Sequence, residues 1–122
     1  MRNEAQIELP LNIDSFVPGS NLTGKIIWNV QTTPSEIVLN LFWHTESKSG
    51  VQVEIVATLK SDSKGLKGDW DFSMSLPTGP YSYAGKVFSV AWALELLIEP
   101  RLVEVRKKII VGPNALEANF VV

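Results

Sequence analysis

The longest apolar run of the chain extends over residues 86–99, and its side chains alternate with a period of two. Every second residue of this run is large and apolar: Phe88, Val90, Trp92, Leu94, Leu96 and Ile98. The residues between them are small or mixed, which is typical of a central β-strand with one face in a core. A helix is the alternative, because Ala, Leu and Glu are good helix formers. We favour the strand, since Val, Phe and Trp dominate the first half of the run.

The other long segments show the same alternation, and turn-forming residues separate them. These segments are 5–13, 22–30, 36–46, 51–59, 69–76 and 103–111. Together with 86–99 they make about seven strands, with turn signals roughly every dozen residues, which predicts an all-β, antiparallel β-sandwich. A chain of 122 residues has the size of one domain, so we expect a single sandwich over 1–122.

Several positions carry more specific structural expectations. Pro10 predicts that the first strand lies at a sheet edge or changes sheet there, because proline cannot donate to a strand ladder. Gly24 predicts a bulge or a close approach of another backbone. We expect the four tryptophans to lie mostly at inward positions. In the segment 51–59 the predicted inward side chains are Val51, Val53, Ile55, Ala57 and Leu59.

Two segments resemble the arrestin-like fold. In 16–26 an aromatic residue, Phe16, precedes Pro18-Gly19, and Leu22 and Gly24 follow before the next strand. In 76–94, Leu76-Pro77 precedes Tyr83-Ala84-Gly85 and the strand that follows it. Both are similar to the pattern of arrestin-like domains. The resemblance implies one immunoglobulin-like, arrestin-type sandwich and a general role in binding proteins.

Composition removes several classes of function. The chain has no cysteine, which excludes thiol catalysis, disulfides and thiolate metal sites. A net charge of -2 gives no reason to expect nucleic acid or an anionic membrane as a partner. No apolar run approaches the roughly 18 residues that a membrane-spanning helix needs, and the N-terminus lacks a signal-peptide core. We therefore expect a cytoplasmic protein without membrane insertion.

Residues suited to catalysis or metal binding are few. The only histidine, His44, stands two residues from Glu46, and we interpret it as solvated or hydrogen-bonded, not as a catalytic base. Asp69 and Asp71 form a carboxylate pair that would suit calcium binding or acid–base chemistry. The simpler interpretation is a solvated sheet face, which we favour. We predict a protein that is not an enzyme, with no catalytic residue, no cofactor and no metal.

Candidate partner-binding residues lie in loops and in one basic strand. The loops are 14–21, 61–68 and 78–85, and the basic cluster falls in 103–111, where Arg106 and Lys108 share one face. That face would dock an acidic peptide or lipid headgroup, or it would protect an edge strand from aggregation. The candidate residues are Phe16, Ser63, Lys64, Tyr81, Tyr83, Arg106 and Lys108.

These observations predict a non-enzymatic interaction module, an adaptor or scaffold that binds another protein through loops or a sheet edge. One alternative is a structural subunit that self-associates into a homo-oligomer, because Phe42, Val56 and Leu97 interrupt otherwise polar or mixed faces. Another is a carbohydrate-binding sandwich that uses Asp69, Asp71 and the loop tyrosines.

Overall fold

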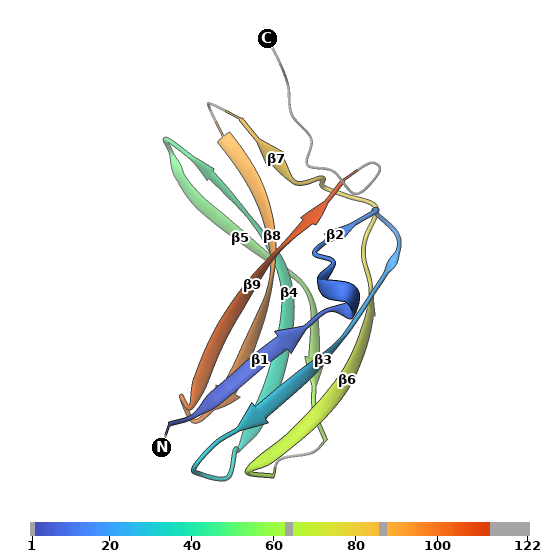
Figure 1. The fold of residues 1–122 in the computed structure, drawn as a ribbon. Coiled ribbons are helices and arrows are strands. Elements are labelled where there is room, and N and C mark those ends of the chain that lie inside the picture. The colour runs from blue at the N-terminus through green and yellow to red at the C-terminus, as the bar shows by residue number, and fades with distance from the viewer. Residues whose placement is uncertain (1, 63–64, 86–87, 113–122) are drawn as a thin grey trace.

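The computed structural model describes residues 2–62, 65–85 and 88–112, which form two packed β-sheets (Figure 1). Within these ranges there is no α-helix, and the one helical turn is a 3₁₀ helix, η1, at Pro10–Asn12. No helix among the described residues is long and apolar enough to cross a membrane. The predicted all-β sandwich is confirmed. The described ranges contain nine strands, seven that correspond to the expected ones and two of two residues each.

The smaller sheet has three antiparallel strands in the order β1-β3-β6. Their bounds are Glu4–Glu8 for β1, Asn21–Asn29 for β3 and Lys67–Ser75 for β6. The larger sheet has the order β2-β9-β8-β4-β5, and β7 also pairs with β8. The bounds are Ser15–Phe16 for β2, Glu36–Ser47 for β4, Gly50–Lys60 for β5, Tyr83–Ala84 for β7, Phe88–Glu99 for β8 and Val103–Val111 for β9.

Strand β8 lies inside the larger sheet, between β4 and β9, which confirms the strand prediction for the longest apolar run. Its inward side chains Val90, Trp92, Leu94, Leu96 and Ile98 are buried. Residues 86 and 87 and the side chain of Phe88 lie outside what the structure describes. A central strand with one face in the core and the other face partly covered carries large apolar residues at every second position and small or mixed residues between them, as this one does.

The core fills the space between the two sheets, and two of the four tryptophans are central to it. Trp28 and Trp92 are fully buried. Their indole Nε1 groups donate hydrogen bonds to the carbonyl oxygens of Gly65 and Pro80, each at 2.9 Å, so neither buried N–H lacks an acceptor. Trp43 and Trp70 pack against the core but remain partly exposed. The prediction of inward tryptophans is therefore confirmed, with two of the four fully buried.

The N-terminal segment changes sheet at Pro10, as that proline predicts. Strand β1 ends at Glu8, and β2 pairs in parallel with β9 in the other sheet. The expectation of one strand through residue 13 is wrong, because the 3₁₀ turn breaks the alternation. Leu11 has a φ of 55° and is 89% exposed. The predicted loop 14–21 likewise contains the short strand β2.

Strand β5 differs from its prediction through a β-bulge. Leu41 pairs with Ala57 and Phe42 pairs with Ile55, so Val56 has no partner on β4. An extra residue reverses the face of every side chain on one side of it. Ala57 packs against the core as expected, but the apolar side chains of residues 51–55 point to the outer face instead. The predicted inward orientation is therefore wrong for Val51, Val53 and Ile55.

Candidate functional site

Strand β5 forms one edge of the larger sheet and is the longest strand at the edge of either sheet. Between Gly50 and Leu59 it carries one charged residue, Glu54, and neither lysine nor proline. Natural edge strands usually carry such residues, because they discourage pairing with another chain. Lys60, at the end of β5, is paired with Glu36 at 2.7 Å. From Gly50 to Ile55 the edge has only Glu54 as a protecting charge.

The main-chain groups of β5 alternate in direction. Ser47 and Gly50 flank the two-residue turn of the β4–β5 hairpin and form its first pair, which is a hydrogen-bonded pair in such hairpins. Alternation then directs the main-chain groups of Gln52 and Glu54 toward β4. The N–H and C=O groups of Val51, Val53 and Ile55 consequently point to the open edge. They are available to a further strand.

Three apolar side chains next to this edge are exposed to solvent. The exposed fractions are 62% for Val51, 61% for Val53 and 57% for Ile55. They lie on the outer face of the sheet, across from Glu46, His44 and Phe42 of β4 respectively. We call Phe42, Val51, Val53 and Ile55 the outer patch. Exposed apolar side chains that gather in one place on a soluble domain are typical of interaction surfaces.

The outer patch continues into a shallow groove of about 210 Å³, which His44, Glu46, Glu95 and Arg106 complete. Phe42 forms its floor and is only 5% exposed, although it points away from the core. The guanidinium carbon of Arg106 lies 5.4 Å from the centroid of the Phe42 ring, in a cation–π contact. The groove is therefore apolar on the β5 side and charged on the β9 side.

Arg106 is fixed by a second contact. Its Nε and one terminal nitrogen each lie 3.0 Å from Oε2 of Glu95, which faces it on β8. The Glu95 side chain is mostly buried, so this pair is better shielded from solvent than the other ion pairs among the described residues. Lys108 lies on the same exposed face, as predicted, and no described carboxylate approaches it within 4.0 Å. Arg106 thus shapes the groove, and Lys108 adds a free positive charge to that face.

His44 has no catalytic surroundings in the described structure. Its Nε2 lies 3.5 Å from Oε1 of Glu46, and its ring centroid lies 6.2 Å from that of Phe42. Neither contact orients a nucleophile, and a catalytic base needs one within hydrogen-bond reach. His44 forms part of the groove wall.

The two later loops are tied to the body of the sandwich. In the loop 61–68 the carbonyl of Leu66 accepts a hydrogen bond from the Val30 N–H at 2.7 Å. Ser63 and Lys64, the residues predicted to bind a partner there, lie outside the described residues. In the loop 78–85 Ser82 is fully buried, and its N–H and Oγ both bond to the main chain of Val111. These contacts give both loops a structural role.

The remaining predicted residues are not brought together with the outer patch. Phe16 lies in β2 and packs against the core. Tyr83 lies in β7, where it pairs with Val90, and Tyr81 is exposed in the loop before it. None of the three lines the groove beside β5, whereas Arg106 does. The structure therefore joins Arg106, and Phe42 as expected on an outer face, to three β5 side chains that were predicted to point into the core.

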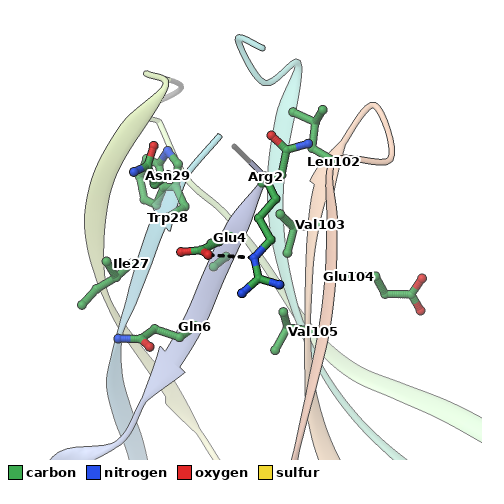
Figure 2. A pocket seen from close by; sticks show the side chains of 12 residues that line it. Arg2, Glu4, Gln6, Ile27, Trp28, Asn29, Leu102, Val103, Glu104 and Val105 are labelled. Carbon is green, nitrogen blue, oxygen red and sulfur yellow. Dashed lines mark hydrogen bonds and ion pairs between the residues drawn. The ribbon is translucent and has the colours of Figure 1, made fainter. Parts of the chain in front are cut away.

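A second opening lies between β1 and β9, where the two sheets are not hydrogen-bonded to each other (Figure 2). This cleft has a volume of about 680 Å³. Trp28, Val103 and Val105 form its apolar part. Arg2 and Glu4 lie at its rim and pair with each other at 3.1 Å. Because these opposite charges already satisfy one another, neither of them is free to select a ligand.

The carboxylate pair of β6 lies on the outer face of the smaller sheet. Asp71 faces Lys25 across the β3–β6 pair, with 3.8 Å between Nζ and Oδ1. Asp69 is the third residue of β6, and that strand begins at the end of the sandwich away from β7, which carries Tyr83 (Figure 1). In the part of the chain that the structure describes, no group of three or more His, Asp or Glu side chains is arranged to hold a metal ion. The structure thus does not assemble the aspartates and tyrosines into one sugar-binding site.

Sequence reasoning missed the outer patch because it continued one alternation through the whole of β5. The signal that was available is the run Ile55-Val56-Ala57, where three apolar residues follow one another and break the period of two. Such a run marks a possible change of face. Only the pairing with β4 shows that the bulge lies at Val56.

Comparison with known proteins gives the fold and no family. No family model matches the chain, and no curated protein matches it. Among solved structures, it is similar to part of the crystal structure of a β-glucosidase from Listeria innocua in complex with gluconolactone. The two share 15% sequence identity at a TM-score of 0.50, over 94% of this chain and 16% of that chain. At this identity the likeness shows the all-β sandwich, and the chain spans only a small part of that protein's length.

Proposed function

We propose that this domain is a non-enzymatic interaction module, an adaptor or scaffold that binds another protein through the β5 edge. The observation that carries the proposal is an edge strand whose outward main-chain groups and exposed apolar side chains belong to the same residues, Val51, Val53 and Ile55. A partner strand laid along this edge gains main-chain hydrogen bonds and apolar contacts together.

The surroundings of β5 fit this mode of binding. The groove beside the outer patch accommodates side chains that a docked strand directs to the outer face, and Phe42 and Arg106 are already held in place there. A preorganised surface loses little conformational freedom on binding. The loops that were the first candidates are tied to the core by their own hydrogen bonds, which supports the edge over the loops.

We also propose that the sandwich is of the arrestin type. The two segments that carry the resemblance contact each other directly. The Gly19 N–H donates to the Pro77 carbonyl at 3.2 Å, and the Leu76 N–H donates to the Ser20 carbonyl at 2.9 Å. Gly19 has a φ of 80°, a conformation that glycine adopts without strain. These hydrogen bonds hold the Pro-Gly turn against the Leu-Pro segment, so the two motifs form one contact.

Partner capture with matched variants tests the function. The tagged chain, Val53→Lys and Ser73→Lys are each incubated with lysate of the source cells at moderate salt, and retained proteins are quantified by mass spectrometry. Ser73 is a suitable control position because it is exposed on β6, an edge strand of the other sheet, and takes the same change of charge. We expect wild type and Ser73→Lys to retain a stoichiometric protein that Val53→Lys loses. An identical retained set for all three proteins would contradict the proposal.

A further inference from the structure

We propose that the strand bound at the β5 edge is β5 of a second copy of this chain, paired antiparallel about a two-fold axis at Val53. The inference rests on the part of the proposed function that places binding at the β5 edge, and it names a second copy of this chain as the occupant of that edge. A two-fold arrangement places the same surface of each copy against the other, so the β5 sequence must be complementary to itself.

The main chain of β5 meets this requirement. With the axis at Val53, Val51 of one copy faces Ile55 of the other, and Val53 faces its own counterpart. The pairing within the β4–β5 hairpin directs the N–H and C=O groups of all three residues to the open edge. Each of these pairs therefore forms both of its main-chain hydrogen bonds.

The side chains on the outer face agree with the same register. Val51, Val53 and Ile55 of the two copies form one continuous apolar surface, which continues on each side into Phe42. Exposed fractions near 60% at these three positions leave much apolar area to be covered. Cross-strand β-branched pairs of this kind stabilise sheets.

The side chains on the opposite face of β5 favour this register over its neighbours. About Val53, Gln52 of each copy faces Glu54 of the other in a non-hydrogen-bonded pair, where side chains are closest. The Gln52 amide then donates to the Glu54 carboxylate. An axis at Glu54 would place the two carboxylates directly opposite each other, which is unfavourable. An axis at Gln52 would bring Val51 opposite Val53 but leave Ile55 facing the turn residue Ser49.

The bulge at Val56 limits this interface. It bends the edge and ends the regular pairing, so the strand available for a partner is Gly50 to Ile55. A two-fold contact also uses the β5 edge of both copies, which closes the assembly at two chains. The contact is short for a stable interface, so we expect a weak, reversible dimer.

Sedimentation equilibrium of the full chain from about 10 μM to about 1 mM tests the dimer. Wild type and Ser73→Lys are expected to show a monomer–dimer equilibrium, and Val53→Lys to remain monomeric, because it places two ammonium groups at the axis. Circular dichroism confirms that each variant is folded. A wild type that stays monomeric throughout, or a Val53→Lys variant that dimerises like wild type, would overturn the proposal.

Two substitutions at Gln52 test the register. Gln52→Lys creates two opposite-charge pairs with Glu54 and is expected to lower the dimer Kd by roughly three- to tenfold. Gln52→Glu creates two like-charge pairs and is expected to raise the Kd by at least as much. With the axis at Gln52, Gln52→Lys would instead oppose two lysines and weaken the dimer, and this result would overturn the register.

The capture experiment separates failure of this inference from failure of the proposed function. Retention of the cell's own copies of this chain supports the dimer. Retention of a different protein that Val53→Lys loses, together with a monomeric wild type, would refute the dimer and leave the interaction module standing. A dimer that depends on Val53, with no other protein retained, would refute the adaptor role and support the dimer.

Discussion

Replacing Gly24 by alanine adds one methyl group on β3, between the main chain of β1 and a buried side chain of β6. A Cβ built on Gly24 would lie 2.5 Å from the carbonyl oxygen of Glu8 and 2.7 Å from Cζ of Phe72. Both neighbours are fixed. Glu8 belongs to the β1–β3 ladder, and Phe72 is buried directly across from Gly24 on β6. The new methyl group therefore forces the strands apart.

The magnitude follows from the cost of overpacking. An extra methyl group in a packed core costs about 1–3 kcal/mol, and a contact with main chain that cannot rotate away places Gly24→Ala near the upper end. Alanine also lowers the entropy of the unfolded chain, which offsets up to about 1 kcal/mol. A net loss of about 2 kcal/mol should lower Tm by about 8 °C, at roughly 4 °C per kcal/mol for a domain of this size.

Denaturant and thermal unfolding, followed by tryptophan fluorescence and circular dichroism, measure this loss. Gly65→Ala is the matched control, because the nearest described atom to a Cβ there, apart from its chain neighbours, is the Lys67 carbonyl oxygen at 3.5 Å. We expect the control to change stability by less than about 1 kcal/mol. If Gly24→Ala were as stable as Gly65→Ala, the close approach of β1 and β6 to β3 would be refuted.

Two further pairs of substitutions each compare a residue that makes specific contacts with a residue on a solvated face. Trp92→Ala should lower the free energy of unfolding by about 3–5 kcal/mol, since it empties a fully buried site. Asp71→Ala, on the outer face of β6, should lower it by less than about 0.5 kcal/mol. Chemical denaturation measures both changes. Arg106→Ala should lower the free energy of unfolding by about 1 kcal/mol through the lost contact with Phe42, and Lys108→Ala should leave it almost unchanged. Equal denaturation midpoints for the two variants would contradict the arrangement of the groove.

The large features of the fold could be predicted because they depend on local alternation. Residues 88–99, 103–111 and 69–76 keep one phase throughout, so their inward faces follow from the period of two alone. Pro10 marked the change of sheet for the same reason, since its chemistry is local. The antiparallel sandwich follows from these strands and the turns between them.

The candidate site could not be predicted because it depends on pairing between distant strands. The bulge at Val56 exists only relative to β4, and it exposes Val53 where alternation placed it in the core. The position of β5 at the sheet edge is likewise a property of strand order. Arg106 was identified by its charge, but its contact with Phe42 joins β9 to β4 across β8.

The path of the chain between the two sheets determines how this domain can fold. The chain changes sheet between β1 and β2, β2 and β3, β3 and β4, β5 and β6, and again between β6 and β7. Neither sheet is therefore made of one continuous stretch, and neither can form without distant parts of the chain. Such a topology folds slowly, on the order of milliseconds to seconds, and in a single cooperative step. Because β4 and β5 are synthesised before β6 and β8, the strands of this hairpin are exposed to other chains during synthesis, and the β5 edge stays open in the finished protein.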